Sequence, residues 1–247
     1  MAQKVAFITG GNRGLGFQTA LDLKDTGTKV VIGSRDLPQG EEAVAKLRTA
    51  GVNADVIQFD ITNPADLQRA YDYFDSNFGR LDILINNAGI AGGTFPGTGP
   101  AHSAGEVPLD LLHRVFETNF FAVIATTNTL LPLIRKSDAG RIVNLSSILG
   151  SLTLHGDPKS PIYHAKSFAY DASKTALNAY TIHLAYELRD TSIKVNSAHP
   201  GWVKTDMGGP EATLEVSEGG KTSAELATLS ADGPTGGFFH LGKALPW

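Results

Sequence analysis

Short apolar runs rich in β-branched residues alternate with longer segments whose apolar residues recur at helical spacing, and this rhythm continues along most of the chain. Such alternation is typical of βαβ units, and because their crossovers are right-handed they stack into a doubly wound parallel sheet. We therefore expect an α/β fold of about seven strands with helices on both faces. The expected strands are 4–9, 29–34, 54–59, 81–86, 140–146, 193–198 and 237–240, and the expected helices are 14–26, 38–50, 64–78, 109–136 and 168–190.

The length of 247 residues fits a single domain spanning 1–247, because no linker or internal repeat interrupts this rhythm. Two segments depart from it. A Gly/Pro-rich stretch at 90–108 follows the fourth expected strand, and residues 202–231 hold a glycine-framed helical stretch after the sixth. Both follow the carboxyl ends of strands, where open α/β sheets bind ligands. We expect 202–231 to form a substrate lid.

Charge and cysteine content exclude several classes of protein. Basic and acidic residues number 21 and 25 and are interspersed, which gives a net charge of −4. Nucleic acids and anionic membranes attract clustered Lys and Arg, so neither is an expected partner. The chain has no cysteine, which removes disulfides and thiol nucleophiles and fits a reducing compartment. We find no signal peptide and no apolar span of ~20 residues, so the expected location is cytoplasmic.

A glycine-rich turn at 9–16, with the sequence Thr-Gly-Gly-Asn-Arg-Gly-Leu-Gly, lies between the first expected strand and the first expected helix. Glycines permit the tight turn and let the backbone approach a pyrophosphate, whose charge lies against the helix N-terminus. An ordinary tight turn is the alternative, but the position in the first βα unit favours a dinucleotide site. The predicted cofactor contacts here are Gly10, Asn12, Arg13, Gly14, Leu15 and Gly16.

The second expected strand ends in Ser34 and Arg35, where an NAD site usually offers an acidic side chain to the adenosine ribose. A hydroxyl and a guanidinium suit a 2′-phosphate, because Arg presents a planar fork of donors to an oxyanion that a carboxylate would repel. Arg13 adds a second cation on the same side. These residues predict NADP. In the alternative interpretation both arginines are solvated surface charges and Asp36 binds the ribose.

Tyr170 and Lys174 are four residues apart in an expected helix and so share one face. An ammonium near a phenol stabilises the phenolate and lowers its pKa from about 10 toward neutrality. Such Tyr–Lys pairs are common on ordinary helix surfaces. This one indicates a catalytic site only together with further motifs elsewhere in the sequence. Those partners follow in order: Asn-Asn-Ala-Gly at 86–89, Asn119, Gly-Arg-Ile-Val-Asn-Leu-Ser-Ser at 140–147, and Pro-Gly-Trp-Val-Lys-Thr-Asp at 200–206.

With these ordered motifs the sequence closely resembles the classical short-chain dehydrogenase/reductase family. The resemblance implies a Rossmann fold, a nicotinamide cofactor and a catalytic tetrad of Asn119, Ser147, Tyr170 and Lys174. Tyr170 would be the general acid that protonates a carbonyl oxygen as hydride arrives, and Lys174 would lower its pKa and bind the nicotinamide ribose. Ser147, the second of two adjacent serines, would orient the substrate oxygen. Asn119 would hold a water that relays protons from Lys174.

The resemblance also implies cofactor contacts along the later strand ends. These are Asp60, Ile61, Asn87, Ala88, Gly89, Tyr170, Lys174, Pro200, Gly201, Val203 and Thr205. Arg13 together with 34–35 looks like the NADP-preferring branch, and the segment 236–247 is similar to monomeric-type carbonyl reductases. The implied activity is NADPH-dependent, reversible reduction of a small neutral ketone or aldehyde to an alcohol, with NAD as the lesser cofactor.

One departure from the family pattern lies between Ser147 and Tyr170, which are 23 positions apart, more than is usual. We expect this insertion to overhang the substrate pocket, and it argues against the helix-mediated tetramer of the family. A monomer and a homo-oligomer both remain open. The insertion contains His155 and His164, which are read as loop residues because their separation fits no usual metal-ligand spacing. No metal is expected.

The substrate pocket is expected to be walled by the loop after the fourth strand, the insertion and the 202–231 segment. The candidate residues are Ile90, Phe95, Leu152, Tyr163, Trp202 and Met207. There are three alternative functions: an NADH-dependent alcohol dehydrogenase of the same family, a non-catalytic dinucleotide sensor, and a sugar-nucleotide epimerase or dehydratase. A sensor needs no general acid, and an epimerase needs a larger C-terminal domain than 202–247 supplies.

Overall fold

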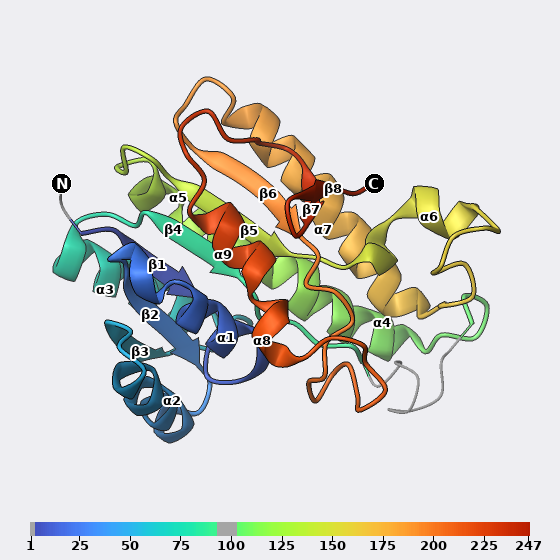
Figure 1. Cartoon of the computed structure of the whole chain (residues 1–247), viewed down its shortest axis with the longest axis horizontal. Coiled ribbons are helices and arrows are strands. Elements are labelled where there is room, and N and C mark those ends of the chain that lie inside the picture. Colours follow the sequence, from blue (N-terminus) through green and yellow to red (C-terminus); the bar gives the residue numbers. More distant parts are fainter. Residues whose placement is uncertain (1–2, 93–102) are drawn as a thin grey trace.

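A single eight-stranded sheet runs through the computed structural model, which describes residues 3–92 and 103–247 (Figure 1). The strand order is β3-β2-β1-β4-β5-β6-β7-β8, and every neighbouring pair is parallel except β7 and β8. This confirms the predicted doubly wound sheet. The strands are β1 Val5–Ile8, β2 Lys29–Ser34, β3 Ala54–Gln58, β4 Ile83–Asn86, β5 Arg141–Leu145, β6 Lys194–Ala198, β7 Phe238–His240 and β8 Lys243–Ala244.

Helices cover both faces of the sheet (Figure 1). They are α1 Gly14–Asp22, α2 Leu37–Thr49, α3 Pro64–Phe78, α4 Leu109–Phe116, α5 Ala122–Ile134, α6 Leu152–Gly156, α7 Phe168–Glu187, α8 Val216–Gly219 and α9 Lys221–Ala227. Apolar residues of α3, α5 and α7 form one core, and those of α1, α2 and α9 form the other.

Strand β1 explains why the chain folds into three layers. Its side chains alternate between the two faces, as they must in a strand. Val5 and Phe7 enter the core under α3, α5 and α7, while Ala6 and Ile8 enter the opposite core. Because both faces are covered, the strand is apolar at every position, which is the continuous run that the sequence shows.

Three features differ from the sequence-based expectation. Strand β8 was not predicted, because it is two residues long and pairs with β7 across a tight turn in which Leu241 and Gly242 both have positive φ. The expected helix 109–136 is interrupted by a π-helical turn at Glu117–Phe121. Within the expected lid 202–231, helix α9 does not have the exposed position of a lid, because it packs against β5 and α1 and its side chains are mostly buried.

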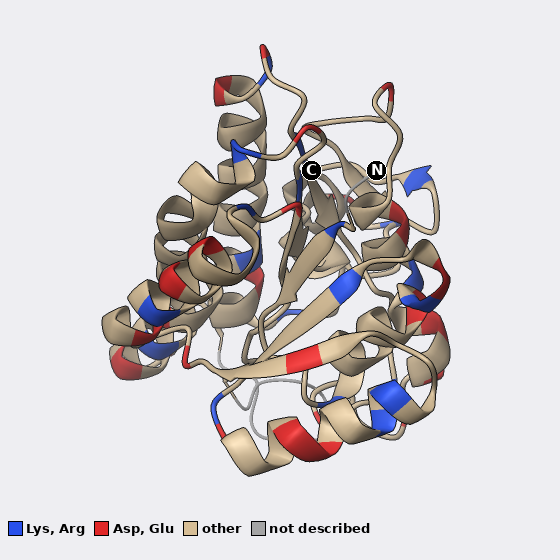
Figure 2. Cartoon of the chain, turned by 90° about the vertical axis from the view of Figure 1, so that its left-hand side faces the viewer, with Lys and Arg blue, Asp and Glu red and all other residues tan. Residues whose placement is uncertain are grey.

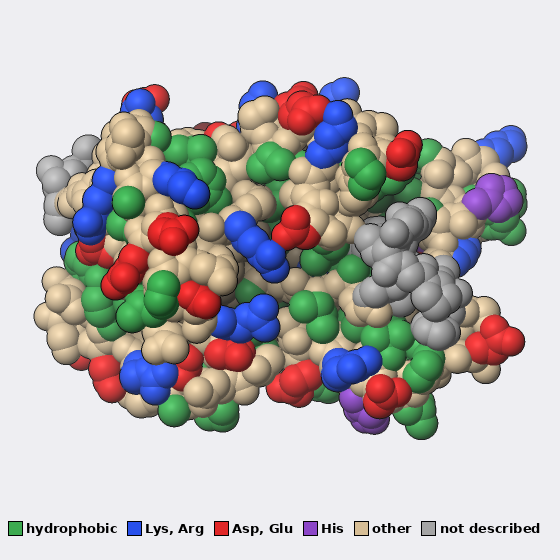
Figure 3. All heavy atoms as spheres, turned by 90° about the horizontal axis from the view of Figure 1, so that it is seen from below, with side chains coloured by type: hydrophobic (Ala, Val, Ile, Leu, Met, Phe, Trp, Pro, Cys, Tyr) green, Lys and Arg blue, Asp and Glu red, His purple; other side chains and the backbone are tan. Residues whose placement is uncertain are grey.

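Charged side chains of both signs are interspersed over the molecule. Figure 2 colours the positions of charged residues on the ribbon, and both signs are scattered along the outer helices. Figure 3 shows basic and acidic groups among hydrophobic ones on the face seen from below. On the face that Figure 3 shows, charges of one sign do not form a broad surface. Within 3–92 and 103–247, no helix combines the length and apolar character needed to cross a membrane.

Candidate active site

A cavity of about 870 Å³ opens at the carboxyl ends of the central strands, where the strand order reverses between β1 and β4. It collects residues that are distant in the sequence. The predicted cofactor residues that line it are Gly10, Asn12, Arg13, Gly14, Leu15, Arg35, Asp60, Ile61, Asn87, Ala88, Gly89, Tyr170, Lys174, Pro200, Gly201, Val203 and Thr205. The topology therefore brings most of the predicted cofactor set to one edge of the sheet.

The glycine-rich turn presents the N-terminus of α1 to this cavity. Gly10 and Gly14 have positive φ, which only glycine adopts without strain. The N-cap residue Arg13 makes no side-chain capping bond, and the first turn of α1 holds no acidic residue. The backbone N–H groups and the positive end of the helix dipole are thus available to an anion, so the turn fits a pyrophosphate.

Gly16 does not line the cavity, and its role lies inside the turn. A Cβ atom there would lie 2.5 Å from Asn87 Nδ2 and 2.5 Å from the Gly10 carbonyl oxygen. The Asn87 amide donates to the carbonyls of Thr9 and Gly10 at 2.8 and 3.0 Å, and so ties the turn to the end of β4. The close approach that glycine permits is needed for this bond.

We therefore expect Gly16→Ala to weaken NADPH binding at least about tenfold and to cost roughly 1–3 kcal/mol of stability, because the methyl group displaces the turn. Gly105→Ala is the matched control, since a Cβ at Gly105 meets no atom of residues 3–92 and 103–247 within 4 Å. Fluorescence titration with NADPH and thermal unfolding measure the two effects. If Gly16→Ala behaves like the control, the close packing of the turn is not required.

The geometry supports one of the two residues predicted at the end of β2. Arg35 lines the cavity, as expected of a phosphate ligand. Ser34 does not line it: its side chain is buried and its hydroxyl donates to the Asp36 carbonyl at 2.6 Å, within the turn that starts α2. The prediction that Ser34 contacts the 2′-phosphate is therefore not supported. Asp36, the alternative ribose ligand, is the N-cap of α2 and accepts from Gln39 N–H.

Arg13 is at the cavity mouth, where its guanidinium pairs with Asp206 at 2.8 Å. Both side chains are strongly exposed, at 69% and 81%, so this ion pair adds little stability. Arg13 can consequently turn to an anionic ligand at low cost. Arg35 and Arg13 together provide two cations near the turn, which fits a phosphate-bearing adenosine ribose.

Tyr170 lies in the first turn of α7, and hydrogen bonding links its phenol to Ser147 at the end of β5. The neighbouring Ser146 points away and donates to Asn178 on α7 at 2.6 Å. The structure thus brings Ser147, rather than Ser146, to the tyrosine. Burial raises the pKa of Tyr170 well above its usual value, more than the hydrogen bond with Ser147 lowers it. The phenol is protonated at every physiological pH.

Lys174 lies one turn further along α7, with Nζ 5.6 Å from the centre of the Tyr170 ring. The Nζ donates to the Leu145 carbonyl at 2.7 Å. Burial lowers the pKa of Lys174 to about 8. Burial is the largest influence on the pKa of both Tyr170 and Lys174, and the lowering of the Tyr170 pKa by the ammonium, which the resemblance implied, stays a prediction.

Asn119 lies in the π-helical turn and is fully buried. Its amide donates to the Ile90 carbonyl at 2.8 Å and to Ser173 Oγ at 3.0 Å, and its Oδ1 accepts from Ile90 N–H at 2.8 Å. Both amide hydrogens are used by the protein, so the side chain cannot also donate to a relay water. These hydrogen bonds of Asn119 fix the chain after β4 against α7. A π-turn at a functional position is a common feature.

The predicted substrate residues divide into two groups. Ile90, Trp202 and Met207 line the cavity. Leu152 is 66% exposed and does not line it, and neither does Tyr163, whose ring packs edge-on against His164. These two predictions are not supported. Phe95 lies outside the described residues.

The insertion does reach the cavity, but through other residues than those predicted. Pro161, Ile162 and Ala165 line it, together with Leu149 from the turn after β5. Ile162, Leu149 and Tyr170 form one buried apolar cluster, against which Met207 packs. The signal in the sequence was Ile162, the one large aliphatic residue between His155 and Ser167, which lies next to the predicted Tyr163.

The two histidines of the insertion do not form a metal site. Both ring nitrogens of His155 are used: Nε2 bonds the Leu149 carbonyl and Nδ1 bonds Lys166. Within residues 3–92 and 103–247, no group of three or more His, Asp and Glu side chains is placed to hold a metal ion.

A doubly wound sheet, an anion-binding turn at its switch point and a buried phenol beside Ser147 and Lys174 define a dinucleotide-dependent oxidoreductase. The profile of the short chain dehydrogenase family matches residues 4–215. The chain belongs to this family.

Individual relatives are similar along their whole lengths. Carbonyl reductase (NADPH) 1 of Mus musculus is 33% identical over an alignment of 284 positions, which covers 100% of this chain and 99% of that protein. Salutaridine reductase of Papaver bracteatum is 30% identical, covering 96% and 94%. Among solved structures, the NADPH-bound carbonyl reductase from chicken fatty liver has a TM-score of 0.83 and 28% identity, with all of both chains covered.

Proposed function

We propose that this protein reduces a neutral ketone or aldehyde to the alcohol with NADPH, and runs reversibly. The observation that carries the proposal is the protonated, buried Tyr170 hydrogen-bonded with Ser147 at the wall of a cavity that also holds Lys174. A non-catalytic sensor has no use for an acid in this place. The names of the carbonyl reductase relatives support the same chemistry.

In the reduction, NADPH supplies the hydride and the chain supplies orientation and the proton. The Ser147 hydroxyl and the Tyr170 phenol converge on one point, where both can donate to a carbonyl oxygen. Tyr170 Oη transfers its proton to that oxygen as negative charge develops on it. Lys174, whose Nζ is held by the Leu145 carbonyl 5.6 Å from the centre of the Tyr170 ring, would favour the resulting phenolate electrostatically.

The cofactor would be held by the turn at 10–15, by the residues after β3 and β4, and by the two arginines. Arg35 and Arg13 would receive the 2′-phosphate, and the N-terminus of α1 the pyrophosphate. Gly89 leaves room beside the reacting groups, because a Cβ there would lie 3.2 Å from Asn119 Oδ1 and 3.7 Å from Lys174 Nζ.

The apolar part of the cavity wall favours apolar substrates. It consists mainly of Ile90, Leu149, Ile162, Trp202 and Met207. Apart from the predicted cofactor residues Arg13, Arg35 and Lys174, the Lys or Arg that lines the cavity is Lys204, which is paired with Glu215 at 2.5 Å and so offers no free clamp for a carboxylate. An apolar wall also excludes water from the proton transfer.

We propose that the lid is the shorter segment 202–215, since α9 belongs to the helical layer. This segment folds on itself through a bridge between Val203 and Leu214, and Trp202 Nε1 donates to the Gly208 carbonyl at 2.9 Å. Its Gly209 has positive φ, which permits a sharp bend near the tip. Trp202 and Met207 would move with it over the substrate.

The substrate test compares an alicyclic or aromatic ketone with a small α-keto acid by following NADPH oxidation. We expect at least about tenfold higher kcat/KM for the ketone, and a three- to tenfold loss with Trp202→Ala, because a large apolar contact disappears. Leu152→Ala is the matched control, since Leu152 is exposed away from the cavity. Preference for the keto acid, or no effect of Trp202→Ala, would show that the assigned wall is wrong.

A further inference from the structure

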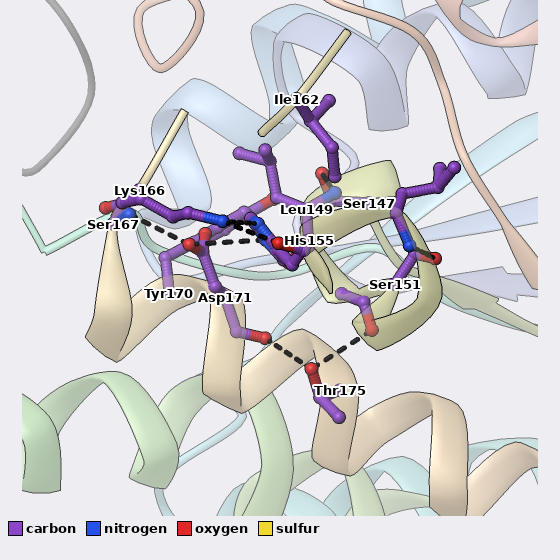
Figure 4. Close-up of polar contacts among 12 residues, drawn as sticks. Ser147, Leu149, Ser151, His155, Ile162, Lys166, Ser167, Tyr170, Asp171 and Thr175 are labelled. Atoms are coloured by element: carbon purple, nitrogen blue, oxygen red, sulfur yellow. Dashed lines mark hydrogen bonds and ion pairs between the residues drawn. The ribbon is translucent and has the colours of Figure 1, made fainter. Parts of the chain in front are cut away.

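A short segment between α6 and α7 carries part of the cavity wall, and its two ends meet at one histidine. His155 in α6 lies at the beginning of this segment and Lys166 at its end. Lys166 Nζ donates to His155 Nδ1 at 2.9 Å and to the His155 carbonyl at 3.1 Å. These two bonds close the loop 156–165 at its base, and Figure 4 marks the polar contacts between Lys166 and His155 with dashed lines.

The partners of His155 determine the protonation of its ring. Nδ1 accepts from an ammonium, so it carries no proton, whereas Nε2 lies 2.9 Å from the Leu149 carbonyl and must donate to it. Burial and the nearby Lys166 charge lower the pKa of His155, which keeps the ring neutral. One neutral imidazole therefore joins the loop to the turn after β5, at a residue that lines the cavity.

The same ring lies against the N-terminus of the catalytic helix. Its Nε2 is 3.5 Å from Asp171 Oδ2, and that oxygen accepts from Ser167 N–H at 2.8 Å just before α7 begins. Asp171 is the residue next to Tyr170, and it is only 8% exposed. Burial raises its pKa to about 7. Figure 4 shows His155 and Lys166 reaching from the loop toward Asp171.

The loop closed in this way presents Ile162 to the reacting groups. Ile162 packs in one buried cluster with Leu149 and Tyr170, and Pro161 and Ala165 beside it also line the cavity. The position of Ile162 relative to Tyr170 thus depends on the hydrogen bonds between Lys166 and His155 at the base of the loop. Lys166 is additionally held over the Tyr163 ring, 5.0 Å from its centre, which limits its freedom further.

We propose that His155 and Lys166 are positioning residues that set the width of the substrate pocket, by closing the loop 156–165 and holding Ile162 against Tyr170. Neither residue touches the reacting atoms. The pair acts on bulky substrates that press against Ile162 and leaves small ones nearly unaffected. This inference deepens the proposed function and rests on it.

The test uses four variants of the full chain. His155→Leu fills the same space without polar atoms, and Lys166→Met keeps the aliphatic stem of an exposed side chain, so it folds even where His155→Leu does not. His155→Asn is the conservative variant, because its Oδ1 replaces the Nδ1 acceptor for Lys166. His164→Leu is the matched control, an exposed histidine in the same loop.

We expect His155→Leu and Lys166→Met to lower kcat/KM about tenfold for a bulky alicyclic ketone and less than about twofold for a small aldehyde, with KM for NADPH unchanged. His155→Asn should recover most of the selectivity, and His164→Leu should match the unmodified chain. Equal losses on both substrates, or unchanged selectivity in Lys166→Met, would overturn the proposal.

Trypsin cleavage after Lys159, an exposed residue of the loop, reports on closure without any turnover. We expect cleavage to accelerate severalfold in His155→Leu and Lys166→Met but not in His164→Leu, because an unfastened loop opens more often. Unchanged cleavage would overturn the proposed closure. If the unmodified chain reduces neither carbonyl, the proposed function fails, while the cleavage rates still decide whether the pair closes the loop.

Discussion

Tyr170→Phe should lower turnover of a ketone by at least about 100-fold while NADPH affinity changes less than about threefold. The substitution removes the proton that the carbonyl oxygen receives but keeps the ring that packs with Leu149 and Ile162. Since burial raises the pKa of Tyr170, its phenol holds the proton that the reduction needs. Steady-state kinetics and NADPH titration measure the two effects separately.

The control for this variant is Tyr186→Phe, which removes the same atom from an exposed tyrosine on the same helix. Its kinetics should equal those of the unmodified chain. A Tyr170→Phe variant that turns over normally would move the general acid to another residue. A variant that loses NADPH binding along with turnover would instead give Tyr170 a structural role in the cofactor site.

Arg35→Ala should lose roughly tenfold or more in kcat/KM with NADPH and little with NADH. Removal of one charge-assisted contact with a phosphate costs about 1.5–3 kcal/mol of binding free energy. NADH has no 2′-phosphate, so its binding does not include this contact. The expected loss falls on Arg35 because Arg35 lines the cavity, whereas Ser34 is buried and bonded to Asp36. Parallel assays with the two cofactors measure the ratio.

Two control variants test whether the loss is specific to Arg35 and to NADPH. Arg114→Ala removes an exposed arginine that pairs with Asp110 on α4, away from the cavity, and should change neither cofactor's kinetics. Ser34→Ala should also leave the NADPH to NADH ratio within about twofold. Equal losses with both cofactors in Arg35→Ala would remove Arg35 from the 2′-phosphate site.

The parallel sheet could be predicted because buried strands need apolar residues on both faces. Strand β1 shows this, since Val5, Ala6, Phe7 and Ile8 are all buried in two separate cores. Strand β8 could not be predicted, because its two residues are exposed and its pairing depends on a turn rather than on burial. The lid had the same limit: the sequence predicts a glycine-framed helical stretch within 202–231 but does not tell whether a helix there covers the cavity or the sheet.

The sequence by itself determined the order of the fold, the anion-binding turn and the pairing of Tyr170 with Lys174, because each depends on spacing within one or two neighbouring elements. The choice between neighbouring side chains came from the three-dimensional packing: Arg35 rather than Ser34 and Ile162 rather than Tyr163 line the cavity. It also placed His155 between Lys166 and Asp171. These choices follow from contacts between distant segments, and local spacing carries no information about the direction in which a loop side chain finally packs.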